Sequence, residues 1–137
     1  MQTKPVLTLD DVKKIGAAAE AEAVANKWNV VITVVDDGGH LLWLQRMDGA
    51  APISSYIAPQ KARTAALGRR ESKVYEDMIN NGRVSFLNAP ELQGMLEGGV
   101  PIVVDGHTVG AVGVSGVKSA EDAQIAKAGI AALGLAA

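Results

Sequence analysis

The sequence contains no cysteine, which excludes disulfide bonds, thiolate metal ligation and a cysteine nucleophile. Aromatic residues are also scarce, with one Phe, two Trp and two Tyr among 137 residues. The hydrophobic core is therefore expected to be aliphatic and rich in alanine. No stretch reaches the roughly 20 consecutive apolar residues that span a bilayer. We therefore expect a soluble protein, with the cytoplasm as its location.

Charge of either sign is not concentrated. Thirteen Lys and Arg residues face fifteen Asp and Glu residues, giving a formal net charge of -2. No basic run is longer than that of Arg69 and Arg70, so the phosphate-neutralising surface of a nucleic-acid-binding protein is not expected. No spacing of acidic and histidine residues indicates a metal site. The length is that of one ordinary domain, and residues 1–137 are expected to form it.

Hydrophobic periodicity and turn residues divide the chain into helices and strands. Thr8 is expected to cap the first helix, and Ser119, with Asp122 three residues later, to begin the last one. Pro59 should kink the central helix or mark its start. The predicted order is helix 8–26, strand 30–35, strand 40–46, helix 52–67, helix 71–80, a loop with one short turn over 83–99, strand 101–104, strand 109–115 and helix 119–133. Two hairpins among helices predict an α+β fold with an antiparallel sheet rather than a parallel doubly wound one.

The first candidate site residues lie around the first hairpin. His40 follows the glycine turn at the start of a strand, where it is either a ligand or general base, or a half-exposed strand residue. Arg46 ends that strand two residues before Asp48. It either binds a carboxylate in bidentate fashion or forms a clamp with Asp48 within the loop. His107 lies in a tight hairpin turn and is expected to be exposed to solvent.

A second group of candidates follows the central helix and the later strands. Lys61 and Thr64 share one helical face, so an ammonium and a hydroxyl can reach one spot. Lys61 is either a base or Schiff-base nucleophile, or a structural lysine that bonds loop carbonyls. The remaining candidates are Glu97 as an alternative base, Gly98 and Gly99 as backbone that a ligand can approach closely, and Ser115 at a strand end. No nucleophile elbow surrounds Ser115, so a serine hydrolase is not indicated.

Five segments in this order resemble the GlcG/HbpS family, also called the haem-degrading domain family. They are Val35-Asp36-Asp37-Gly38-Gly39-His40-Leu41, Arg46-Met47-Asp48-Gly49-Ala50, Lys61-Ala62-Arg63-Thr64-Ala65, Gly98-Gly99-Val100-Pro101-Ile102 and Val109-Gly110-Ala111-Val112-Gly113-Val114-Ser115-Gly116. The resemblance covers nearly the whole chain. It implies a profilin-like antiparallel β-sheet flanked by α-helices, homo-oligomers of two or more copies and, in several members, haem as a bound cofactor. Some members belong to catabolic operons.

Two functional hypotheses follow. In the first, the chain binds haem or a related planar carboxylate ligand and is able to degrade haem; Arg46 and Lys61 hold the carboxylates, and His40 or Thr64 approaches the iron. In the second, a small cofactor-independent enzyme or accessory protein acts on a short organic acid, with Lys61 or Glu97 as base and Arg46 as anchor. The scarcity of aromatic residues favours the second. A scaffold that binds no ligand is the third alternative.

Overall fold

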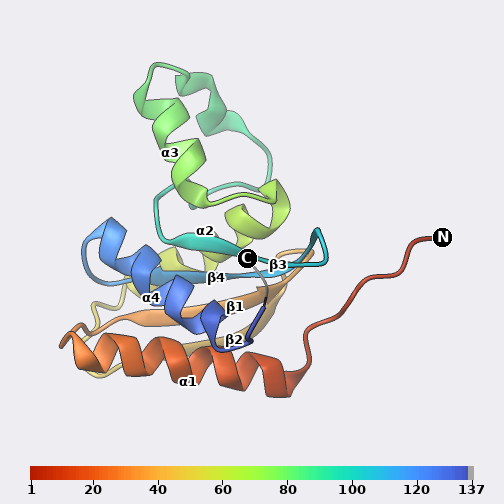
Figure 1. Cartoon of the computed structure of the whole chain (residues 1–137). Coiled ribbons are helices and arrows are strands. Elements are labelled where there is room, and N and C mark those ends of the chain that lie inside the picture. The colour runs from red at the N-terminus through yellow and green to blue at the C-terminus, as the bar shows by residue number, and fades with distance from the viewer. Residues whose placement is uncertain (136–137) are drawn as a thin grey trace.

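The computed structural model describes residues 1–135, which form four α-helices, one short 3-10 helix and four β-strands (Figure 1). In chain order the elements are α1 (Leu9–Ala25), β1 (Val31–Asp36), β2 (Leu41–Arg46), α2 (Ser54–Gly68), α3 (Ser72–Asn80), η1 (Val84–Asn88), β3 (Gly99–Val104), β4 (His107–Ser115) and α4 (Ser119–Ala131). No helix within this part of the chain is long and apolar enough to cross a membrane.

The strands form one antiparallel sheet in the order β2-β1-β4-β3, which confirms the predicted α+β class. In the central pair, formed by β1 and β4, Val31 lies opposite Ser115 at one end and Asp36 lies opposite Gly110 at the other. Because β1 and β4 run in opposite directions, both hairpin turns lie at the same end of the sheet. We call this end, with residues 36–40 and 104–108, the hairpin end.

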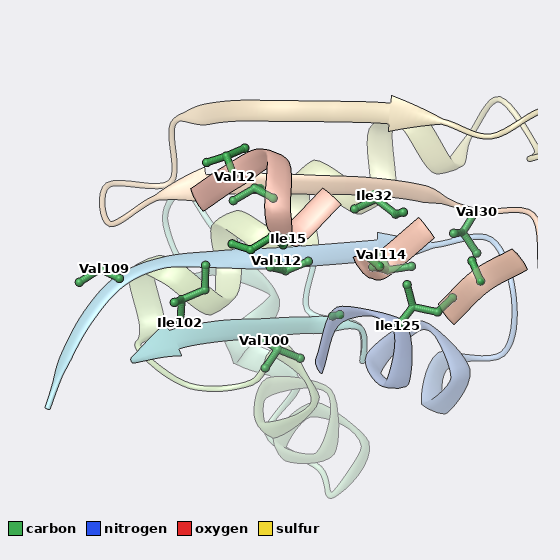
Figure 2. Packing of buried hydrophobic residues seen from close by; sticks show 14 residues of the cluster. Val12, Ile15, Val30, Ile32, Val100, Ile102, Val109, Val112, Val114 and Ile125 are labelled. Atoms are coloured by element: carbon green, nitrogen blue, oxygen red, sulfur yellow. The ribbon is translucent and has the colours of Figure 1, made fainter. Parts of the chain in front are cut away.

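Helices cover both faces of the sheet. In Figure 1, α1 and α4 lie on one face and α2 lies on the other, while α3 and η1 project beyond the sheet. Successive side chains of β1 therefore face different helices. Ile32 and Val34 pack toward α1 and α4, whereas Val31 and Val35 pack against alanines of α2. The larger core between the sheet and α1 and α4 is aliphatic, as expected (Figure 2). Its fully buried members include Val12, Ile15, Val30, Ile32, Val34, Ile102, Val112, Val114 and Ile125.

The backbone of α2 lies directly on the sheet because glycines face it. A Cβ atom on Gly113 would lie 2.2 Å from the carbonyl oxygen of Ala58, and one on Gly99 would lie 2.1 Å from that of Lys61. Both distances are far below van der Waals contact. The glycines of β3 and β4 therefore set how closely α2 approaches, and so where its side chains point.

Helices α1, α2 and α4 begin within two residues of their predicted starts. At α1, the Asp11 amide donates to Thr8 Oγ1 (3.2 Å), which confirms Thr8 as the N-cap. Helix α2 begins at Ser54 and continues through Pro59 rather than starting there. At α4, Ser119 is the first helical residue and not the cap, and the Lys118 amide donates to Glu121 Oε1 (3.2 Å). The predicted start of the last helix at Ser119 is therefore confirmed.

Candidate functional site

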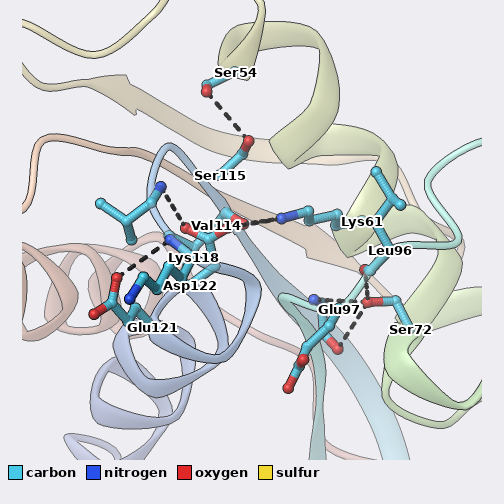
Figure 3. Close-up of polar contacts among 12 residues, drawn as sticks. Ser54, Lys61, Ser72, Leu96, Glu97, Val114, Ser115, Lys118, Glu121 and Asp122 are labelled. Carbon is cyan, nitrogen blue, oxygen red and sulfur yellow. Dashed lines mark hydrogen bonds and ion pairs between the residues drawn. The ribbon is translucent and has the colours of Figure 1, made fainter. Parts of the chain in front are cut away.

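Lys61 of α2 is buried, and its ammonium is hydrogen-bonded within the protein (Figure 3). Its Nζ donates to the carbonyl oxygen of Val114 on β4 and to Asp122 Oδ2 on α4, both at 2.9 Å. The side chains of Lys61 and Asp122 are only 4% and 3% exposed. Asp122 Oδ1 also accepts the backbone amide of Val117 at 3.2 Å. These contacts match the structural alternative for Lys61, and they connect α2, β4 and α4 through one buried ion pair.

The carboxylate that pairs with Lys61 was missed by sequence reasoning. Asp122 lies in the first turn of α4, where an acidic residue is ordinarily explained by capping and by the helix dipole. Burial raises the pKa of Asp122, and the nearby Lys61 ammonium partly opposes that rise. The only sequence signal was that Asp122 stands beside the buried alanine stripe of its helix, here Ala123 and Ala126.

Gly98 and Gly99 make room for protein groups. A Cβ atom on Gly98 would lie 2.8 Å from Lys61 Nζ and 2.8 Å from the Val114 carbonyl oxygen. Gly98 also has a positive φ of 132°, which a residue with a side chain rarely adopts. Ligand approach at these glycines stays a prediction, since in this structure the space is used by Lys61 and by α2.

Ser72, at the first residue of α3, anchors the start of β3. Its Oγ accepts the Gly99 amide at 2.8 Å and donates to the carbonyl oxygen of Leu96. We expect Ser72→Ala to lower the free energy of unfolding by about 1–3 kcal/mol, because the buried Gly99 amide loses its acceptor. Urea denaturation measures this change. Ser119→Ala, on a residue exposed at the start of α4, serves as the control, and equal stability of the two variants would contradict the anchoring role.

Ser115, Thr64 and Glu97 do not converge on one open pocket. Ser115 Oγ donates to Ser54 Oγ (3.2 Å) within the protein interior. Thr64 is fully buried, and within the described residues its hydroxyl has no hydrogen-bond partner. Glu97 is half-buried, and its backbone amide donates to Glu76 Oε1 (3.1 Å). Catalysis by Lys61 or Glu97 stays a prediction.

Arg46 and Asp48 lie at the end of the sheet opposite the hairpin end. Both are exposed, and the ion pairs among residues 1–135 do not include one between them. They border a shallow depression of about 330 Å³, together with Glu20, Asn29, Gln45 and Met47. The loop clamp is therefore not formed, and the guanidinium faces solvent.

His40 lies at the other end of β2 from Arg46. Its side chain is 76% exposed, and Nδ1 lies 3.2 Å from Asp36 Oδ1. Its backbone amide donates to the same oxygen at 2.9 Å. The structure therefore separates the predicted site residues into a buried group around Lys61, an exposed group around Arg46, and His40 at the hairpin end.

A larger and more enclosed pocket lies at the hairpin end, and we call it the hairpin pocket. The N-terminal segment, the residue after α2 and the β3–β4 hairpin enclose about 500 Å³. Among residues 1–135 no carboxylate lines it, whereas an imidazole, a guanidinium and an ammonium do. The Lys4 ammonium is also paired with Asp37, outside the lining. Its lining residues are Gln2, Thr3, Lys4, Arg69, Val103, Gly106, His107 and Thr108.

Sequence reasoning assigned His107 to solvent, but the residue is half-buried and lines this pocket. The available signal was topological: two hairpins whose central strands pair antiparallel bring both turns, and both histidines, to one end of the sheet. Arg69 reaches the pocket because it follows α2 in a left-handed conformation, with a φ of 56°. Within residues 1–135, no group of three or more His, Asp and Glu residues is arranged to hold a metal ion.

Comparison with known proteins agrees with this fold. The family model described as haem degrading protein HbpS-like matches residues 7–131. The chain belongs to this family. Protein GlcG of Escherichia coli K12 is 60% identical over 115 residues, covering 84% of this chain and 85% of GlcG.

Solved structures of HbpS-like proteins match over almost the full length. The crystal structure of HbpS superposes with a TM-score of 0.88 at 31% identity, covering 97% of this chain and 94% of HbpS. The crystal structure of a PduOC:Heme complex superposes with a TM-score of 0.86 at 28% identity, covering 96% of this chain and 98% of PduOC. At least one structural relative of this chain is therefore known with haem bound.

Proposed function

We propose that this protein binds haem, or a related planar ligand with carboxylate groups, in the hairpin pocket. Membership in the HbpS-like family and the haem complex of PduOC support the ligand class. The observation that carries the location is the composition of the pocket, in which His107, Arg69 and Lys4 occur and no carboxylate of the described residues is part of the lining. A ligand with two propionates and a metal that accepts imidazole matches these groups.

The residues present fit such a ligand. The volume of about 500 Å³ suits a planar molecule lying partly in solvent, and Val103 supplies an apolar contact. Arg69 would hold a propionate, with Lys4 nearby, and the His107 imidazole would approach the iron. Bound haem would supply redox chemistry at its iron, and degradation of haem by this protein is part of the proposal. The earlier arrangement based on Arg46 and Lys61 is less favoured, because Lys61 is engaged with Asp122.

A haem titration followed at the Soret band tests the proposal. We expect saturable binding at one haem per chain, with affinity reduced about tenfold or more in His107→Ala and in Arg69→Ala, because each change removes one specific contact. His40→Ala is the matched control, since His40 also lies at the hairpin end but does not line the pocket. Loss of the Soret band on adding a reductant in the presence of dioxygen, which is the oxidant that ring opening requires, would report degradation.

Two outcomes would contradict the proposal in different ways. If His40→Ala weakens binding and His107→Ala does not, the ligand lies beside the first hairpin instead. If no saturable spectrum forms, haem is not the ligand. The polar lining of the pocket then favours a small organic acid, which a thermal-shift screen of carboxylates, repeated on Arg69→Ala, would identify.

A further inference from the structure

The N-terminal segment, residues 1–7, is held to the rest of the protein by an apolar contact and an ion pair. Leu7 packs against the core between the sheet and α1 and α4, and its Cδ1 would lie 2.7 Å from a Cβ atom on Gly110. The ion pair joins the Lys4 ammonium to the Asp37 carboxylate. Among the described residues, it provides the only hydrogen bond between this segment and the rest of the protein. In Figure 1 the segment extends from the start of α1 beyond the helices and strands.

The residues between these two contacts form a short, stiff arm. Pro5 has a fixed φ and restricts the preceding residue, Lys4, to extended backbone. Val6 is 79% exposed, so packing holds this part of the segment only weakly. Because the arm is anchored at Leu7, the place of Lys4 and of the residues before it depends on whether the ion pair with Asp37 is formed.

This arm supplies one wall of the hairpin pocket. Gln2, Thr3 and Lys4 line the pocket, whereas Asp37 does not. Asp37 belongs to the turn between β1 and β2, while the turn between β3 and β4 supplies another part of the lining. The ion pair therefore fixes a wall of the pocket from a position outside the pocket.

The strength of this ion pair suits a contact that opens and closes. The side chains of Lys4 and Asp37 are 39% and 46% exposed, and an ion pair in such surroundings changes an equilibrium by at most about fivefold. The pair is then broken in roughly one molecule in six at any time. The buried pair of Lys61 and Asp122 does not have this property, because breaking it leaves charges inside the protein.

We propose that the ion pair of Lys4 and Asp37 is a latch, which holds residues 2–4 in place as a wall of the hairpin pocket, and that a ligand enters and leaves when the latch opens. Asp37 is then a positioning residue, since it acts on the ligand through Lys4 without touching the ligand. This inference rests on the proposed binding of a ligand in the hairpin pocket. If Asp37 instead competed with a ligand carboxylate for Lys4, its removal would slow dissociation of the ligand.

The rates of haem binding test the latch. Asp37→Asn removes the charge and keeps the shape, so the rate constants of association and dissociation should both rise about three- to fivefold. Stopped flow measures the first, and transfer of haem to excess apomyoglobin measures the second. Asp37→Glu should restore the wild-type rates. Asp77→Asn is the matched control, because the pair of Lys73 and Asp77 on α3 is similarly exposed. Wild-type rates in Asp37→Asn, or slower dissociation, would overturn the latch.

A spin label tests the latch without haem. The chain has no cysteine of its own, so Thr3→Cys accepts a single nitroxide label beside Lys4. The label should become more mobile when Asp37→Asn is added, which narrows the lines of its electron paramagnetic resonance spectrum, and should not change when Asp77→Asn is added. Equal mobility in these two variants would overturn the latch. A wild type that binds no haem would contradict the proposed function, while a more mobile label in Asp37→Asn would still support the latch.

Discussion

Asp122→Ala is expected to lower the free energy of unfolding by about 3–5 kcal/mol, since it leaves the buried Lys61 ammonium without its carboxylate. The pair is 2.9 Å apart and almost completely buried. The Val117 amide loses its acceptor as well. Urea denaturation followed by circular dichroism measures the loss. The double variant Lys61→Met with Asp122→Leu should recover most of it, because apolar groups of similar volume often replace a buried ion pair without penalty.

The matched control is the exposed ion pair between Lys4 and Asp37. Their side chains are 39% and 46% exposed, so Asp37→Ala should change stability by about 1 kcal/mol or less. An Asp122→Ala variant as stable as Asp37→Ala would show that the buried pair does not hold α2 and α4 together.

The Lys61→Met variant should also make stability dependent on pH. Burial raises the pKa of Asp122 and Lys61 opposes the rise, so removing the ammonium moves the folded-state pKa further above the ordinary value of 3.8. Between these two pKa values the folded state binds more protons than the unfolded state, and stability falls as pH rises. The free energy of unfolding of Lys61→Met should therefore fall below that of wild type by less at pH near 5 than at pH near 7, as measured by the same denaturation. A deficit independent of pH would contradict this account.

Gly113→Ala is the second substitution with a large expected effect. The added methyl group would lie 2.2 Å from the Ala58 carbonyl oxygen and 2.5 Å from the Ala62 amide nitrogen. Both are backbone atoms of α2 and cannot rotate away, so the helix must separate from the sheet. We expect a loss of about 3 kcal/mol or more, at the upper end of overpacking effects, measured as a lower urea midpoint.

Gly38→Ala provides the control for this glycine. There the added methyl group would lie 2.8 Å from the ring of His40, an exposed side chain that can rotate into solvent. The expected change is small, within about 0.5 kcal/mol, as for surface substitutions in general. A Gly113→Ala variant equal in stability to Gly38→Ala would mean that α2 is not held against the sheet by close backbone contact.

The elements and the sheet were predictable because local signals and tertiary packing agree. Val31 to Val35 form a β-branched run, the Asp-Gly pairs mark hairpin turns, and Thr8 has the spacing of a cap. The effect of Pro59 was harder to predict. A proline early in a helix removes only one hydrogen bond, and packing of the flanking alanines holds this helix together. The burial of Asp122 was not predicted, because capping and the helix dipole already explain a carboxylate in the first turn of a helix.

The candidate site was less predictable than the fold. Sequence motifs named Lys61, Gly98 and Ser115 as separate candidates. The structure places Gly98 against the Lys61 ammonium, which bonds the carbonyl oxygen of Val114, the residue before Ser115. Which polar residues face solvent depends on contacts between segments far apart in the chain, such as Lys61 with Asp122. The hairpin pocket depends on the same kind of information, because residues 2–4, 69 and 103–108 meet only after folding.

The direct contact between the α2 backbone and the sheet has a consequence for motion. Without intervening side chains at Gly99 and Gly113, α2 has no compressible layer on which to slide, so helix and strands should move as one rigid body. Any change of shape that accommodates a ligand in the hairpin pocket must then occur in the N-terminal segment and the two turns. Their amides should show the greatest change in hydrogen exchange when the ligand binds. The amides of α2, and those of β4 after Thr108, should exchange at the same slow rate with or without the ligand.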